Sequence, residues 1–97
     1  MKVVGIGRLE DFFRRHADAK PQISAWISEV KAAQWETPHD VKGRYPSVSF
    51  LADNVVVFNI KGNHYRLVVK ISYNVQVVLI QRIGTHSEYS KWNLKGD

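Results

Sequence analysis

Two short blocks in the second half of the chain carry residue types that bind phosphate and move protons. The first block, residues 58–67, reads FNIKGNHYRL, and the second, residues 85–89, reads THSEY. Arginine forms paired hydrogen bonds to a phosphate, and histidine or tyrosine can exchange a proton with a reacting oxygen. Metal-free cleavage of RNA requires this set, because that reaction needs a cation for the developing charge, a base and an acid.

Arg66 has the clearest position in the first block. It follows a tight turn predicted at residues 61–63 and lies in a strand predicted at residues 64–73. Because side chains alternate along a strand, His64, Arg66 and Lys70 share a polar face. The opposite face is apolar and is expected to face the core: Tyr65, Leu67, Val69 and Ile71. An arginine in this position either pairs within the protein or offers its planar group to a phosphate.

The next predicted strand, residues 75–83, is expected to add Arg82 to the same surface. Its alternation places four residues on one face: Gln76, Val78, Ile80 and Arg82. Arg82 is therefore predicted to lie beside the polar face of the preceding strand. An ordinary solvated sheet face is the alternative explanation, and for Lys70 it is the favoured one.

The second block predicts the start of a short helix. Thr85 and Glu88 have the spacing of a capping box, which makes His86 the first helical residue. Tyr89 lies three residues further and so shares a face with His86. The free amides and the dipole of a helix N-terminus attract phosphate, which favours a functional role. In the structural alternative, His86 only belongs to the cap and Tyr89 only packs.

Composition favours a globular protein with an anionic partner. The 97 residues are expected to form one domain, residues 1–97, and they carry a net charge of +5. Counting the sequence, residues 61–97 hold 6 Lys and Arg against 2 Asp and Glu, whereas residues 1–60 hold 8 against 7. This asymmetry predicts an anion-binding surface in the C-terminal half, for RNA, DNA or an acidic protein segment.

Several classes of protein are disfavoured by the sequence. The chain has no cysteine, and its four histidines show neither paired ligand spacing nor an accompanying carboxylate cluster, so no metal site is predicted. It shows no serine nucleophile elbow and no phosphate-binding loop. No signal peptide or membrane-spanning run is visible, so we expect a cytoplasmic protein that does not enter a membrane.

The order of the predicted elements indicates an α+β fold. A strand at residues 3–6, broken by Gly7, precedes two helices whose apolar stripes and aromatic residues are expected to form the core. The second helix opens at Pro21, and Thr37 caps a brief third one that ends near residue 43. Strands then follow at residues 47–51, 55–60, 64–73 and 75–83, and Gly84 is expected to break the sheet. Residues after 94 are expected to fray.

Together the two blocks resemble the HigB family of type II toxin–antitoxin toxins, within the RelE-like superfamily. The family pattern is a Val-Phe-Asn-x-x-Gly-Asn-x-x-Arg-Leu segment followed by Thr-His-x-Glu-Tyr. Residues 57–67 and residues 85–89 match this pattern with the same spacing. The helix around Leu9 and residues 37–47 are also similar, so the resemblance covers nearly the whole chain.

The resemblance implies a RelE-like fold, in which a small antiparallel sheet has two N-terminal helices packed on one face and a short C-terminal helix. It implies an endoribonuclease that cleaves mRNA on the translating ribosome and needs no cofactor. It also implies a HigA-type antitoxin with a helix-turn-helix domain, which neutralises the toxin. Operator DNA is expected to be contacted only through that antitoxin.

The catalytic hypothesis assigns Arg66 as the phosphate clamp and His86 as an acid or a base. Tyr89 is expected to orient or stack on a base of the RNA, or to donate a proton. The 2′-hydroxyl of the RNA acts as the nucleophile, without a metal. The remaining RNA-binding candidates are Lys61, Asn63, His64, Lys70, Arg82 and Lys91.

Two alternatives stay open, because a fold does not determine a target. In one, the basic face belongs to a module that binds nucleic acid or protein without catalysis. In the other, the chain is a RelE-fold toxin with a different target, such as DNA gyrase.

Overall fold

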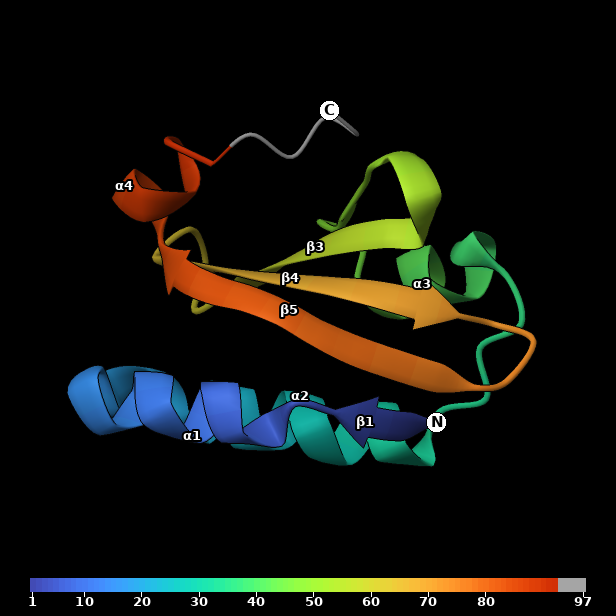
Figure 1. Ribbon diagram of the computed structural model, residues 1–97, viewed down its shortest axis with the longest axis horizontal. Coiled ribbons are helices and arrows are strands. Elements are labelled where there is room, and N and C mark those ends of the chain that lie inside the picture. The colour runs from blue at the N-terminus through green and yellow to red at the C-terminus, as the bar shows by residue number, and fades with distance from the viewer. Residues whose placement is uncertain (93–97) are drawn as a thin grey trace.

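The computed structural model describes residues 1–92, and the fraying predicted after residue 94 lies outside this range. A five-stranded sheet in the order β1-β5-β4-β3-β2 lies against two helices, α1 and α2 (Figure 1). The strands are β1 (Lys2–Val4), β2 (Ser49–Phe50), β3 (Val55–Ile60), β4 (Tyr65–Ser72) and β5 (Val77–Thr85). The helices are α1 (Ile6–Arg15), α2 (Lys20–Ala32), α3 (Pro38–Arg44) and α4 (His86–Tyr89), with short 3₁₀ turns at Ala17–Ala19 and Ala52–Asn54.

The predicted α+β fold is confirmed, and the sheet differs from the expected one in its first strand. From β2 to β5, each strand pairs antiparallel with the next one along the chain. β1, in contrast, pairs in parallel with β5, with Val3 opposite Val78. No short hairpin joins these two strands, so chain connectivity does not force them to be antiparallel. The sheet is therefore mixed.

Two glycines act differently from the prediction. The break after β1 occurs at Gly5, which has a φ of 97° and precedes the first residue of α1, whereas Gly7 lies inside that helix. Gly84 does not break the sheet, because it belongs to β5 and pairs with Arg66 of β4. The first turn therefore falls two residues earlier than predicted, and the predicted break at Gly84 was wrong.

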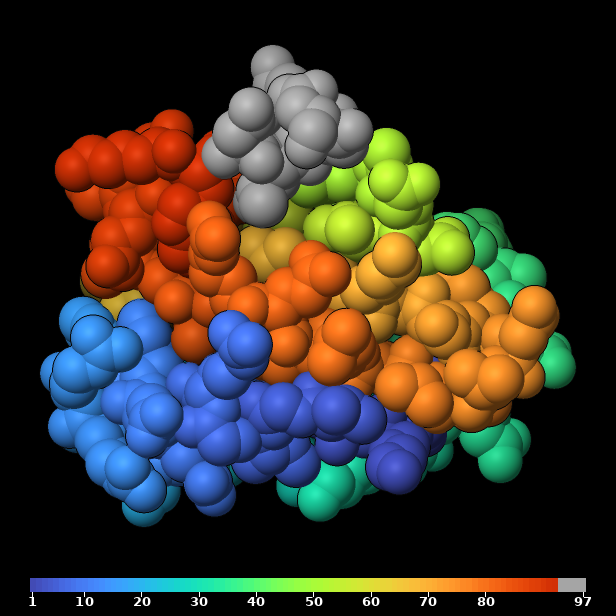
Figure 2. Space-filling model, viewed as in Figure 1, coloured from blue at the N-terminus to red at the C-terminus, as the bar shows by residue number. Residues whose placement is uncertain are grey.

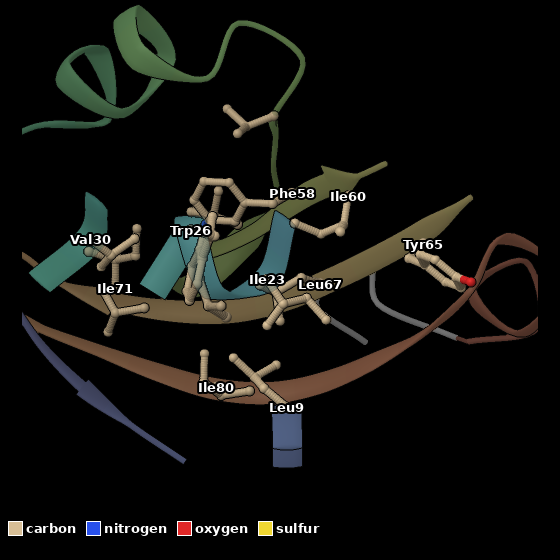
Figure 3. Close-up of a cluster of buried hydrophobic side chains, with 14 of the residues drawn as sticks. Leu9, Ile23, Trp26, Val30, Phe58, Ile60, Tyr65, Leu67, Ile71 and Ile80 are labelled. Atoms are coloured by element: carbon tan, nitrogen blue, oxygen red, sulfur yellow. The ribbon is translucent and has the colours of Figure 1, made fainter. Parts of the chain in front are cut away.

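One face of the sheet and the apolar stripes of the helices form the core. The indole of Trp26 in α2 meets the ring of Phe58 in β3 edge-on at 5.3 Å, and Leu9 of α1 is fully buried (Figure 3). Each buried aliphatic or aromatic side chain of this kind contributes about 1.5–3 kcal/mol relative to exposure. The aromatic residues of the helices are thus core residues, as predicted. The single domain over residues 1–97 stays a prediction.

The opposite face of the sheet is polar at its rim and apolar at its centre. Asn59 and Arg66 pair across β3 and β4, and Val57 and Val68 form the next pair on the same face. Both valines are buried, at 2% and 1% exposure, yet they lie outside the core cluster. We call this surface the outer face.

A β-bulge in β5 decides which of its residues reach the outer face. Val68 pairs with Arg82 and Val69 pairs with Ile80, so Gln81 is an extra residue in β5. The alternation therefore reverses at this point. Ile80 points to the core and Arg82 to the outer face, and the prediction that both share a face was wrong. Arg82 nonetheless lies where it was expected, beside the polar face of β4.

We expect Gly5→Ala to lower the free energy of unfolding by about 1–3 kcal/mol, because alanine is strained at a positive φ. An added Cβ would also lie only 3.1 Å from the Cβ of Ile80. Gly7→Ala is the matched control, since nothing lies within 4 Å of its Cβ position. This helical substitution should stabilise the protein by about 0.5–1 kcal/mol. Urea denaturation measures both, and equal effects would contradict the role of Gly5.

Candidate active site

The β3–β4 turn holds Arg66 through its main-chain carbonyls. Lys61 and Gly62 both have positive φ values, 53° and 64°, and the His64 N–H donates to the Lys61 oxygen at 3.2 Å. Nη1 of Arg66 donates to the oxygen of Asn63 at 3.0 Å and to that of Tyr65 at 3.4 Å. The predicted turn is therefore a direct support for the guanidinium. Asn63 contributes through its main chain.

Two arginines and two aromatic rings form a row on the outer face. The guanidinium of Arg66 lies 5.6 Å from the ring centroid of Tyr89, and that of Arg82 lies 4.8 Å from the ring of Trp92. The two rings meet edge-on at 5.9 Å. These contacts are in the range of cation–π attraction. We call these four residues the cation–aromatic row, and it brings the predicted residues Arg66, Tyr89 and Arg82 together.

The capping box that starts α4 is present, but it leaves little room for a phosphate. Thr85 Oγ1 accepts from the Glu88 N–H at 3.1 Å, and the Thr85 N–H donates to Glu88 Oε1 at 2.8 Å. The latter bond lowers the pKa of the Glu88 carboxyl and keeps a negative charge there. The His86 N–H donates to the His64 oxygen at 3.0 Å. The free amides expected at this helix start are thus largely occupied, and α4 is one turn long.

Gly84 allows α4 and Trp92 to lie close against β5. A Cβ built on Gly84 would lie 2.7 Å from Cζ2 of Trp92 and 2.9 Å from Oε1 of Glu88. Both distances are shorter than real contacts allow, so a larger residue would displace the ring or the cap. The lack of a side chain at Gly84 therefore shapes one end of the cation–aromatic row.

Lys61 is separated from this row by an ion pair. Its Nζ donates to Asp18 Oδ2 at 2.8 Å, and Asp18 also accepts from the Tyr65 hydroxyl at 2.8 Å. Asp18 comes from the short turn between α1 and α2, so the contact lies on the helix side of the sheet. The carboxylate of Asp18 therefore balances the charge of Lys61, which we expected to contact RNA. The same contacts anchor the turn that supports Arg66.

The remaining candidates are exposed at the edges of the outer face. Lys70 lies between Val55 and Leu79 in the sheet register, and Lys91 follows α4. His64 and His86 are both exposed and are joined through the main chain at the turn. No group of three potential metal ligands gathers within residues 1–92. Over the same residues, no helix is long and apolar enough to cross a membrane.

Three contributors were not assigned from the sequence: Asp18, Gly84 and Trp92. Trp92 follows Tyr89 at a spacing of three, which is the signal that could have paired their rings. Asp18 carries no such signal, because it is 43 residues away from Lys61 along the chain.

The outer face thus combines positive charge with aromatic surface. Its arginines can bind anionic oxygens, its rings can stack against flat groups, and the phenol of Tyr89 can transfer a proton. This chemistry fits a nucleic-acid backbone with unstacked bases better than a small apolar ligand.

Comparison with known proteins agrees with this surface. Residues 19–92 match the HigB toxin family, described as the RelE-like toxic component of a toxin–antitoxin system. The chain belongs to the HigB toxin family. It is 26% identical over 83 residues to the mRNA interferase toxin HigB of Escherichia coli strain K12, covering 84% of this chain and 80% of that relative. The mRNA interferase HigB proteins of Escherichia coli O157:H7 and Shigella flexneri match with the same figures.

The family assignment confirms the resemblance inferred from the two sequence blocks and the RelE-like fold. As the toxic component of a toxin–antitoxin system, this HigB-family chain has an antitoxin as its partner. The matched residues include both blocks and the whole cation–aromatic row, whereas α1 precedes them.

We expect Asp18→Asn to destabilise the protein at neutral pH and to remove part of its acid sensitivity. The bonds from Lys61 and Tyr65 lower the pKa of the Asp18 carboxyl from 3.8 to about 2. A lowered pKa means that this contribution is present above pH 3.8 and is lost as the pH falls to about 2. The stability difference between wild type and variant should therefore shrink over this window.

Denaturant unfolding of both proteins at a series of pH values tests this expectation. Asp11→Asn is the control, because its ion pair with Arg14 is exposed and should contribute little. If the difference in unfolding free energy between wild type and Asp18→Asn stays constant down to pH 2, the ionised Asp18 carboxylate does not stabilise the fold through Lys61 and Tyr65.

Proposed function

We propose that this chain is an endoribonuclease that cleaves mRNA and thereby stops translation and growth. The relatives of the same family carry the name mRNA interferase, which supports cleavage of mRNA as the activity. The observation that carries the proposal for this chain is the position of Arg66 beside Tyr89 on a cationic outer face.

Arg66 is the group that would stabilise the charge of the transition state. Within the described residues, its two hydrogen bonds both involve Nη1, so Nε and Nη2 remain for a phosphate. Because the Asn63 and Tyr65 carbonyls fix the guanidinium in advance, little reorganisation is needed when negative charge develops. Removing one preorganised donor of this type costs about 100-fold to 1000-fold in rate.

His86 and Tyr89 supply the proton transfers in this mechanism. The 2′-hydroxyl attacks the adjacent phosphorus as a base removes its proton, and the bond to the 5′-oxygen breaks as an acid protonates that oxygen. The products are a 2′,3′-cyclic phosphate and a 5′-hydroxyl. The order of the two roles is left open between His86 and Tyr89, and the aromatic ring of Tyr89 can also orient a base. No metal ion takes part in this scheme.

The translating ribosome would hold the mRNA against the outer face. Positioning of this kind can contribute up to about 7–11 kcal/mol, so a weak acid and base suffice. The partner that neutralises the toxin would be a HigA-type helix-turn-helix antitoxin, through which operator DNA is contacted. We therefore expect the protein to act in the cytoplasm, where translation takes place.

We expect Arg66→Ala to lower mRNA cleavage in cells at least 100-fold, because the cation for the transition state is lost. His86→Ala should also lose cleavage. Brief induction of each variant, followed by mapping of mRNA ends, measures both effects. Arg14→Ala is the control, since this exposed arginine of α1 pairs with Asp11.

Each other outcome of this experiment is informative. Growth arrest with intact mRNA would exclude the ribonuclease and favour another target, such as DNA gyrase. Wild-type cleavage by His86→Ala would remove its role as acid or base without removing the activity.

The proposed attack by the 2′-hydroxyl predicts the chemistry of the new ends. Downstream fragments should carry a 5′-hydroxyl, so a ligase that needs a 5′-phosphate should capture them only after treatment with a polynucleotide kinase. Fragments from the uninduced culture provide the background. Direct ligation without the kinase would contradict this mechanism.

A further inference from the structure

A groove of about 330 Å³ lies where α1 meets the bulge of β5. Its lining combines residues of α1, β4 and β5: Arg8, Val68, Leu79, Ile80, Gln81 and Arg82. In the space-filling view, the blue atoms of the first residues border the orange atoms of β5 along a continuous seam (Figure 2). The groove therefore exists only because α1 packs beside the bulge.

The bulge fixes the position of Arg8 at this groove. Nη1 of Arg8 donates to the main-chain oxygen of Gln81, the extra residue of β5, at 3.2 Å. Arg8 itself is exposed. It lies three residues after Gly5, where the chain turns from β1 into α1. The guanidinium is thus held at the rim of the groove and has further N–H groups for a ligand.

The groove has the charge and floor expected of a nucleotide site. Two arginines line it, and none of its lining residues is acidic. The neighbouring carboxylate Asp11 of α1 is paired with Arg14 instead. Leu79, at 41% exposure, gives the groove apolar surface on which a base can lie. A nucleotide would place its phosphate at the arginines and its base against Leu79.

The groove is continuous with the cation–aromatic row. Arg82 belongs to both, and it pairs with Val68, two residues along β4 from Arg66. Two residues of strand correspond to about 7 Å. Cations beside aromatic rings are the features with which proteins bind a single strand of nucleic acid.

We propose that the groove between Arg8 and Arg82 is a second RNA subsite, which binds a nucleotide adjacent to the one cleaved at Arg66. This inference rests on the proposed function, because it assumes that the outer face binds RNA. It adds a role for α1, which precedes the residues that match the family. Arg8 binds a backbone phosphate in this arrangement and takes no part in the chemistry.

The test measures RNA binding separately from cleavage. The probe is a fluorescent 12-nucleotide single-stranded RNA whose 2′-hydroxyls are all methylated, so that it cannot be cleaved by the proposed mechanism. Fluorescence anisotropy with the full chain at several salt concentrations gives the affinity and its salt dependence. We expect Arg8→Ala to weaken binding about 5-fold to 10-fold and to reduce the salt slope by about 0.7, the value for one phosphate of a single strand.

Two further variants make the result specific. Arg14→Ala removes an equal charge from the same helix outside the groove and should bind as the wild type does. Arg8→Lys should recover most of the affinity, because the phosphate contact mainly needs a positive charge. Thermal unfolding of each variant checks that the fold is retained.

Several outcomes would overturn the subsite. Wild-type affinity for Arg8→Ala, equal losses for Arg8→Ala and Arg14→Ala, or no binding of the probe by the wild type would each do so. Unchanged RNA binding with lost binding of a polyglutamate peptide would assign the groove to an acidic protein partner. Weaker RNA binding by Arg8→Ala, together with intact mRNA in cells that express the wild-type protein, would retain the subsite while removing the proposed cleavage.

Discussion

The extra residue in β5 is the constraint on which the two faces of the sheet depend. Before it, β5 must send Val78 and Ile80 into the core, and after it the strand must present Arg82 to solvent. A regular strand cannot do both in this register, because every side chain two residues further returns to the same face. The bulge at Gln81 resolves the conflict locally. It also frees the carbonyl that orients Arg8, so packing of the core and charge of the surface have one common origin.

Much of the fold follows from local sequence patterns, and the parts that do not are set by contacts between distant residues. A run rich in β-branched residues predicted β3 to the residue, and the Thr85–Glu88 spacing predicted the cap of α4. Arg66 and Tyr89, which the resemblance assigned to one site, lie 5.6 Å apart from guanidinium to ring centroid, and their roles stay a prediction. The bulge and the parallel pairing of β1 leave no local signature.

The distribution of charge explains why a chain of net +5 can keep cations close together on one face. Lys61 is neutralised by Asp18 on the helix side, where the turn needs an anchor and a free cation would serve no purpose. Arg66 and Arg82 are each placed over a ring instead. A ring attracts a cation without cancelling its charge, so both guanidinium groups stay available to an anion. The protein thus separates structural cations from binding cations by the partner it gives them.

The contact between Arg82 and Trp92 has a consequence for how this molecule can be observed. Of the three tryptophans, Trp26 and Trp35 are 2% and 6% exposed, whereas Trp92 is half-buried beneath a guanidinium. A charge 4.8 Å from an indole influences the energy of its excited state, and any anion that draws the arginine away changes that influence. The fluorescence of Trp92, measured above the constant fluorescence of the two core tryptophans, therefore reports anion binding at the outer face without a label on protein or ligand.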